Sequence, residues 1–166
     1  IRVLPQSEWA VFDRSVIARR LACESQRPDQ IRSLDSLRTA VEPIAAALAA
    51  INANEEQVAR LKELAQHLSE LTEAGAGNTE EFLESDKEFH TLLLIASGNE
   101  MFAALAEPIM NVLEGRTRYG IMPDEPEIAT MRLHSDLAEA IERGDVQASE
   151  RTSRSLLHGI SQFMEI

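Results

Sequence analysis

The sequence predicts an all-α protein, and three observations support this fold class. Only 7 of the 166 residues are glycine and 6 are proline, no stretch shows the apolar–polar alternation of a strand, and apolar residues recur every three or four positions. With 44% hydrophobic and 27% charged residues, the chain has the composition and length of one folded domain with a core. Short connections between long helices favour antiparallel neighbours, so we expect a helical bundle.

The N-terminal half of the chain predicts three helices. The first amphipathic segment, over residues 9–21, ends before Pro28. A long helix follows over about residues 29–51, and we expect Pro43 to bend it because proline lacks a backbone donor. Asn54 is then expected to cap a third helix, whose leucines recur at helical spacing.

The pattern of the C-terminal half of the chain predicts four more helices. Thr79 begins a fourth helix, and Asn99 begins a fifth that contains Pro108, where we expect a kink. Beyond an extended loop at residues 123–126, a sixth helix ends at Gly144, and a seventh follows directly.

Charge and composition exclude several classes of function. The net charge is −12, from 28 acidic and 16 basic residues, which disfavours direct binding of this chain to a phosphate backbone. No run approaches the roughly 18 consecutive apolar residues of a membrane span. The single cysteine, Cys23, has no partner for an internal disulfide. The chain begins without a methionine, so we expect it to be part of a longer protein.

Three polar residues on apolar helix faces indicate a metal site. Asp86 and His90 are one helical turn apart and share a face with Phe89, so both are predicted to point into the core. His134 lies on the apolar face of a different helix. A carboxylate and an imidazole at i, i+4 can bind one ion, and a histidine from a facing helix can complete the site. The alternative is a buried Asp–His hydrogen bond, with His134 simply packed in the core.

Two arginines on apolar faces indicate an anion site. Arg38 lies on the buried face of the long helix, and Arg116 lies on that of the fifth helix. Two guanidinium groups directed into a bundle favour a pocket for a small carboxylate or phosphate, because guanidinium binds such groups with two hydrogen bonds. The alternatives are an i, i+4 ion pair between Arg38 and Glu42, and an Arg116 side chain that extends to water.

The remaining histidines do not join this pattern. His158 lies two positions beyond Leu156, on the far side of the last helix, and His67 lies at the margin of an apolar face, so periodicity predicts that both are exposed. The sequence contains no nucleophile elbow, P-loop, dinucleotide fingerprint or Cys–His pair. The common enzyme signatures are therefore absent.

Four short runs occur in a characteristic order: SLRTAVEPIAA at 36–46, DKEFH at 86–90, ASGN at 96–99, and a stretch from His134 to Gly144 and Asp145. Together they resemble the C-terminal effector-binding domain of FadR-like regulators of the GntR superfamily. The resemblance covers about residues 28–165. Residues 1–5 resemble the end of the wing of the N-terminal winged helix-turn-helix in such proteins, and the segment after them resembles the linker helix.

This resemblance implies a fold, a function and partners. It implies an antiparallel bundle of six or seven helices with a central cavity, which senses a small organic acid, in a cytoplasmic homodimer. It divides the chain into residues 1–27, a wing remnant and linker helix, and residues 28–166, the effector-binding domain. The whole protein would be a bacterial transcription regulator, not an enzyme, and would bind operator DNA only through an N-terminal domain that this sequence lacks.

Many members of the family hold a divalent metal in the cavity, bound by one aspartate and three histidines. Asp86, His90 and His134 match three of these ligands, and such a site favours Zn or Ni. The fourth histidine would stand at Leu156, and His158 is two positions late. Either the last helix is shifted so that His158 turns inward, or the site has three protein ligands, or the metal is lost. Helical phase favours the second or third possibility.

Arg38 matches an arginine in the cavity of the family, whereas Arg116 is a candidate from periodicity alone. The leading hypothesis is a ligand-sensing regulatory domain. The alternatives are a metal-dependent hydrolase with an Asp/His/His site and a structural bundle with buried polar pairs. The pattern shows no further inward carboxylate beside the three ligands to act as a general base, which counts against the hydrolase.

Apolar residues outside the main helix faces indicate a surface for a second copy of the chain. Leu94 and Ile95 in the fourth helix, and Ala103 and Ala104 in the fifth, lie off these faces. We therefore expect the chain to form homodimers.

Overall fold

The structure, a computed structural model, describes residues 5–120 and 128–161, and these residues form eight α-helices and no strand. The predicted all-α fold is confirmed. After a short 3-10 helix, η1 (Gln6–Glu8), the helices are α1 (Arg14–Ala22), α2 (Arg27–Asn52), α3 (Glu55–Glu73), α4 (Glu80–Ala96), α5 (Glu100–Ala104), α6 (Ala106–Arg118), α7 (Ile128–Glu142) and α8 (Val146–Ser161).

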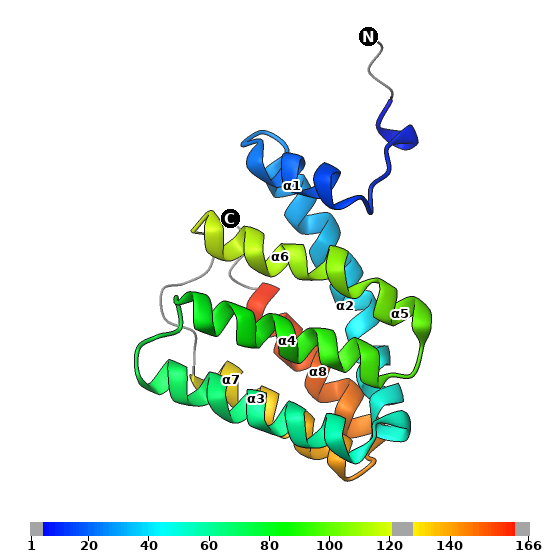
Figure 1. The fold of residues 1–166 in the computed structure, drawn as a ribbon, viewed down its shortest axis with the longest axis vertical. Coiled ribbons are helices and arrows are strands. Elements are labelled where there is room, and N and C mark those ends of the chain that lie inside the picture. The colour runs from blue at the N-terminus through cyan, green and yellow to red at the C-terminus, as the bar shows by residue number, and fades with distance from the viewer. Residues whose placement is uncertain (1–4, 121–127, 162–166) are drawn as a thin grey trace.

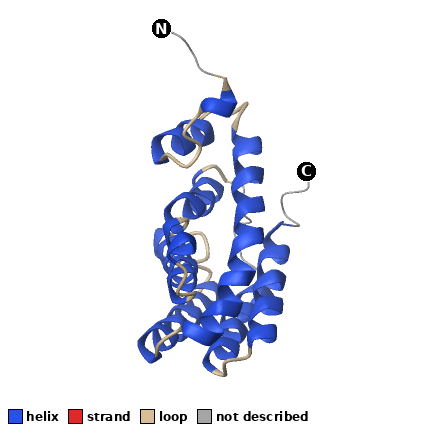
Figure 2. Cartoon of the chain, turned by 90° about the vertical axis from the view of Figure 1, so that its right-hand side faces the viewer, coloured by secondary structure: helices blue, strands red, loops and turns tan. Residues whose placement is uncertain are grey.

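The helices pack in two layers. Figure 1 shows α6, α4 and α3 one below another, with α2 and α8 behind them. The chain reverses direction between α3 and α4 and again between α4 and α6, so neighbours in this layer are antiparallel, as predicted. Figure 2 shows the long α2 helix along the other side of the molecule, with α8 beside it. Seven helices, α2 to α8, thus form the bundle, and α1 packs on its α2 and α6 side.

Local sequence explains most helix boundaries. The side chain of Asn54 accepts a hydrogen bond from the backbone of Gln57, whose side chain accepts one in return from the backbone of Asn54, forming a capping box at the start of α3. Thr79 and Asn99 cap α4 and α5 in the same general way. Helix α2 continues through Pro43 without ending.

Two predicted helices differ from the structure. The first begins only at Arg14, because Asp13 accepts hydrogen bonds from the next backbone amides as an N-cap, and Phe12 before it is 59% exposed. The predicted fifth helix is two helices, which meet at Leu105 rather than bending at Pro108. Pro108 has no N–H for the carbonyl of Ala104 and its ring crowds that carbonyl, so the helix breaks before the proline.

The core contains two apolar clusters that share α2 and α4. One lies among α2, α3, α4, α7 and α8 and includes Leu61, Phe89 and Leu137, and the other lies among α1, α2, α4 and α6. Leu94, which we expected on the surface, is fully buried in the second cluster because α6 covers that side of α4. The prediction for Leu94 is therefore wrong, whereas Ile95 is 47% exposed.

Some expectations concern residues outside the described ranges. The wing remnant includes residues 1–4, and the loop at residues 123–126 falls within 121–127, neither of which the structure describes. Over the described ranges, no helix is long and apolar enough to cross a membrane.

Candidate metal and anion site

A cluster of buried polar side chains lies on α2 and α4, the helices that both apolar clusters share, and on α6 and α7. Helix α2 contributes three residues, α4 two, and α6 and α7 one each. The members are Asp35, Arg38, Glu42, Asp86, His90, Arg116 and His134. All except Asp35 fall in the buried class, so the cluster lies inside the bundle.

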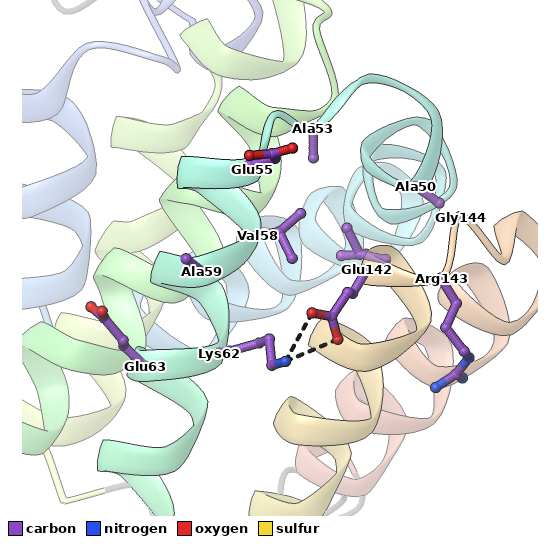
Figure 3. Close-up of a pocket in the computed structure, with 11 residues that line it drawn as sticks. Ala50, Ala53, Glu55, Val58, Ala59, Lys62, Glu63, Glu142, Arg143 and Gly144 are labelled. Atoms are coloured by element: carbon purple, nitrogen blue, oxygen red, sulfur yellow. Dashed lines mark hydrogen bonds and ion pairs between the residues drawn. The ribbon is translucent and has the colours of Figure 1, made fainter.

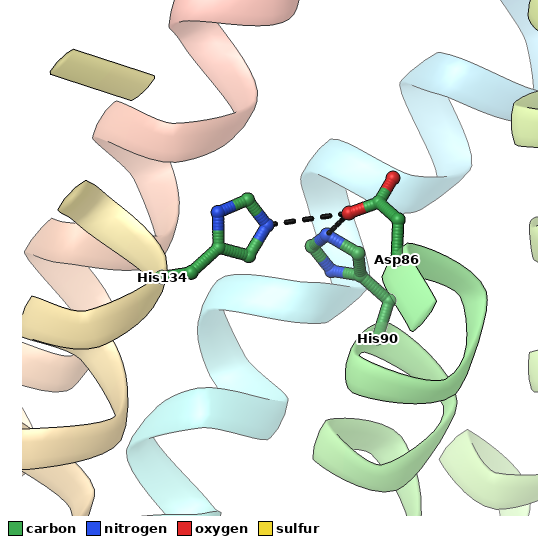
Figure 4. A group of neighbouring side chains, drawn as sticks. All are labelled: Asp86, His90 and His134. Atoms are coloured by element: carbon green, nitrogen blue, oxygen red, sulfur yellow. Dashed lines mark ion pairs between the residues drawn. The ribbon is translucent and has the colours of Figure 1, made fainter. Parts of the chain in front are cut away.

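Asp86, His90 and His134 converge as the sequence predicted (Figure 4). Asp86 and His90 project from successive turns of α4, and His134 approaches from α7. Asp86 Oδ1 lies 3.4 Å from His90 Nε2 and 3.3 Å from His134 Nε2. The ring of Phe89 packs edge-on against both imidazoles, with centroids 5.4 and 4.9 Å away. The three side chains therefore face one another beside a buried aromatic ring.

Glu42 of α2 orients His90. Its Oε2 lies 2.7 Å from His90 Nδ1. An ionised carboxylate only accepts hydrogen bonds, so Nδ1 carries the proton and donates to Glu42. In a neutral imidazole, Nε2 is then an acceptor, and it faces the acceptor oxygen of Asp86. Two acceptors at this separation need a cation or a proton between them.

Burial and charge act in opposite directions on these groups. Burial alone would raise the pKa of Glu42, but Arg38 and His90 hold it below its usual value. Burial would likewise raise the pKa of Asp86, but the two imidazoles hold it well below its usual range. For His134, burial prevails over Asp86 and lowers the pKa, so the neutral imidazole is favoured. Burial and Arg38 would lower the pKa of His90, but Glu42 and Asp86 raise it.

The donor set fits a divalent metal ion. His90 Nε2 and both ring nitrogens of His134 are buried and make no hydrogen bond. Two ligand atoms bound tetrahedrally to one ion at ordinary zinc distances are about 3.4 Å apart, which matches both contacts of Asp86. Asp86, His90 and His134 would hold the ion, and Glu42 would act as the carboxylate that fixes a ligating histidine.

The two arginines lie in the same buried region. Arg38 Nε donates to Glu42 Oε1 at 2.6 Å, and Arg116 Nη2 donates to Asp35. The remaining nitrogens, Nη1 and Nη2 of Arg38 and Nε and Nη1 of Arg116, are buried without a hydrogen-bond partner. Buried unsatisfied donors are costly, and those on a cation especially so. These four nitrogens are therefore suited to bind an anion.

The fourth candidate for a metal ligand, His158, does not lie with the other three. His158 is exposed on α8, as periodicity predicted, and it does not belong to the Asp86, His90 and His134 group. Leu156, at the position of the fourth histidine, is fully buried and packs in the first apolar cluster.

The sequence analysis did not predict the contacts of two residues of the cluster. Glu42 was considered only as a partner of Arg38, and Asp35 was not considered. Asp35, Arg38 and Glu42 lie at i, i+3 and i+7 on one face of α2, and this spacing was the available signal. Glu42 is also an inward carboxylate beside the metal candidates, contrary to our expectation. It already accepts hydrogen bonds from Arg38 and His90, so it is not free to act as a base.

A separate hollow of about 690 Å³ lies at the end of the bundle and contains none of the predicted site residues (Figure 3). Parts of α2, α3 and α7 line it, and Lys62 donates to both carboxylate oxygens of Glu142 across it. Both side chains of this ion pair are about half exposed, which makes the pair a useful contrast to the buried cluster.

Comparison with known proteins decides the family. Residues 33–159 match the family model described as FCD domain. The chain belongs to the FCD domain family. A structure of Streptococcus agalactiae GntR is similar, with a TM-score of 0.68 and 21% sequence identity, over 84% of this chain and 60% of that one. This likeness shows a shared fold, and the chain spans about 60% of the length of that protein. A comparison with curated protein sequences found no match.

The FCD domain is the C-terminal effector-binding domain of GntR/FadR-like regulators, so the resemblance described above is confirmed. The regulators of this family are not enzymes. The expectation that this chain is not an enzyme is therefore confirmed by its family, and the hydrolase alternative has no further support.

Proposed function

We propose that this FCD domain is the effector-sensing and dimerisation domain of a metabolite-responsive bacterial transcription regulator, and that it binds a small organic acid and a divalent metal. One observation carries this proposal. Five side-chain nitrogens on Arg38, Arg116 and His134 are buried without a hydrogen-bond partner, and Nε2 of His90 and of His134 lie within 3.4 Å of Asp86, in the interior of a domain whose family binds effectors. A ligand and an ion would satisfy these nitrogens, and packing alone does not.

The metal part of the proposal is supported by the donors. Asp86, His90 and His134 supply one carboxylate oxygen and two imidazole nitrogens within 4.8 Å of one another. Imidazole-rich sites favour borderline metals, so the ion is Zn or Ni. The exposed His158 is not a ligand, and three protein ligands leave positions open for water or an effector.

The effector part is supported by the arginines. Arg38 and Arg116 have buried, unsatisfied guanidinium nitrogens and belong to the same cluster as the metal candidates, and Glu42 connects Arg38 to His90. Guanidinium recognises planar anions such as carboxylates. A metabolite with a carboxylate therefore fits this site better than a neutral molecule of the same size.

The dimer part is supported by a groove of about 540 Å³ along α4, α5 and α6. Ile95, Ala103 and Ala104, all predicted to lie on a partner surface, line this groove. Ile95 is 47% exposed, and Met101 on the adjoining α5 is 68% exposed. We propose that a second copy of the chain covers this face.

The regulator would contact DNA through another domain. With a net charge of −12, the chain is poorly suited to a phosphate backbone. Residues 1–27, which include α1, would form the wing remnant and the linker from a preceding winged helix-turn-helix, and residues 28–166 the effector-binding domain. Such a regulator acts on the chromosome and would be cytoplasmic.

Elemental analysis and thermal unfolding test this function together. Protein purified without chelator should contain about one Zn or Ni ion per chain, and small carboxylates should raise its melting temperature, because a ligand that binds only the folded state stabilises it. Glucose, which carries no charge, should change the melting temperature far less. A chain that contains no metal, takes up none on titration, and is not stabilised by any carboxylate would contradict the proposal.

A further inference from the structure

Helix α1 is short and lies at one edge of the bundle, above α6 in Figure 1. A helix of 9 residues is too short to be stable by itself in water, so its position depends on what it contacts. Two of its residues, Ile17 and Leu21, are buried. The ion pair of Arg14 with Glu107 on α6 joins two exposed side chains at 3.7 Å and contributes little. The remaining contacts of α1 therefore decide how firmly it is held.

Arg27, the first residue of α2, holds the C-terminal end of α1. Its Nε donates to the carbonyl of Leu21 at 2.6 Å, and its Nη2 donates to that of Ala22 at 3.2 Å. These carbonyls lie in the last turn of a helix, where intrahelical partners are lacking and a cation is favoured. The same guanidinium group lies over the ring of Tyr119, with its central carbon 3.9 Å from the ring centroid. Since Tyr119 is the C-cap of α6, Arg27 joins the end of α1 to the end of α6.

Gly115, one turn before Tyr119 on α6, allows α1 to approach closely. A Cβ atom at this position would lie 3.2 Å from both methyl carbons of Leu21, which is closer than ordinary van der Waals contact. Leu21 therefore packs against α6 at a point where α6 has no side chain. Leu21, Arg27, Tyr119 and Gly115 form a closed ring of contacts, which we call the α1 clamp.

The turn of α6 that forms part of the α1 clamp also reaches the buried polar cluster. Arg116 lies on this turn, between Gly115 and Tyr119. Its side chain is fully buried and donates to Asp35, about two turns after Arg27 on α2. The last turn of α6 thus contacts α2 at two levels, through Arg116 in the interior and through Tyr119 at the edge. Because one turn of helix carries both contacts, a shift of this turn would change both.

We propose that the last turn of α6 couples the attachment of α1 to the buried polar cluster, with Arg27 and Tyr119 as positioning residues. The α1 clamp holds α1 on the bundle, and a displacement of Arg116 in the interior loosens it. This coupling requires no ligand, so it stands independently of the proposed function. In the proposed regulator α1 belongs to the linker, and the α1 clamp would set the direction in which that linker leaves the bundle.

Hydrogen exchange of the backbone amides of α1 measures how often α1 detaches. Tyr119→Leu removes the aromatic ring but keeps an apolar side chain. It should speed exchange over residues 14–22 by about tenfold, which is the effect expected when a half-buried cation–π contact is lost. Tyr119→Phe keeps the ring and should leave the exchange rates of α1 near those of the parent. Arg60→Ala, which removes a half-exposed arginine in surface ion pairs, serves as the control and should change nothing in α1.

A double-mutant cycle tests the coupling to the polar cluster. Asp35→Asn removes the carboxylate that Arg116 contacts, and it should speed exchange in α1. With Tyr119→Leu already present, the additional effect of Asp35→Asn should be smaller by about threefold or more, because the clamp that transmits it is gone. Amides of α3, which packs in the first apolar cluster, provide the reference for overall stability. If Asp35→Asn does not fold, Arg116→Lys takes its place, because it keeps the charge but not the planar donor group.

The outcomes separate the clamp from the coupling. Unchanged exchange of α1 in Tyr119→Leu would overturn the α1 clamp. Equal acceleration in α1 and α3 would show a loss of overall stability and would overturn it as well. Effects of Asp35→Asn and Tyr119→Leu that multiply in the double variant would overturn the coupling to the polar cluster.

Discussion

Glu42 accepts hydrogen bonds from two buried side chains at once. Its Oε1 lies 2.6 Å from Arg38 Nε, and its Oε2 lies 2.7 Å from His90 Nδ1. One carboxylate therefore positions an anion-binding candidate and a metal-binding candidate together. Any shift of Glu42 would change both.

Glu42→Gln should weaken binding of Zn²⁺ by about 10- to 100-fold, because outer partners of a ligating histidine have effects of this size. It should also lower the free energy of unfolding by about 3 kcal/mol, because Arg38 would lose its carboxylate in the interior. Calorimetry and urea unfolding measure the two effects.

The half-exposed Lys62–Glu142 pair provides the matched control. Glu142→Gln should change the stability by no more than about 0.5 kcal/mol, because water screens this pair. A folded Glu42→Gln variant with the Zn²⁺ affinity of the parent would show that Glu42 does not orient the metal ligand.

Substitutions on α7 and α8 test the number of metal ligands. His134→Ala should abolish binding of Zn²⁺, whereas His158→Ala should leave it nearly unchanged, because His158 is exposed and lies outside the ligand group. Leu156→His places an imidazole at the position of the family's fourth histidine and should tighten binding. Calorimetry on the three variants measures this. Equal losses in His134→Ala and His158→Ala would show that α8 has a different phase when the ion is bound.

Helical periodicity predicted the site to the level of helix faces. It placed Asp86, His90, His134, Arg38 and Arg116 inside, and all five are buried. Their burial follows from one period and one apolar face, which local sequence determines. Which of them touch depends on how α2, α4, α6 and α7 pack, and no local pattern contains that information.

Leu94 shows that helix packing also buries residues that periodicity places outside the core. We assumed one buried face per helix, but α2, α3 and α6 all pack against α4, so residues off its main face are buried as well. The contact of Glu42 with His90, between residues 48 positions apart, was missed for a related reason. Helix boundaries were predicted better, because caps and prolines act within a few residues.

Leu94 and Ile95 are adjacent and separate the core of α4 from its outer surface. Leu94→Ala should destabilise the chain by about 2–5 kcal/mol, because it leaves a cavity in a fully buried position. Ile95→Ala should change stability much less but should weaken dimerisation, because Ile95 lines the proposed dimer groove. Urea unfolding and sedimentation equilibrium measure the two effects. A parent chain that is monomeric at tens of micromolar would count against a dimeric regulator.

The final prediction concerns DNA. Residues 1–166 should show no measurable binding to DNA at physiological salt, because phosphate contacts supply most of even non-specific affinity and this chain has a net charge of −12. Fluorescence anisotropy with a labelled duplex provides the measurement, and a longer protein that carries a winged helix-turn-helix before residue 1 is the positive control. Sequence-specific binding by residues 1–166 alone would overturn the assignment of DNA recognition to another domain.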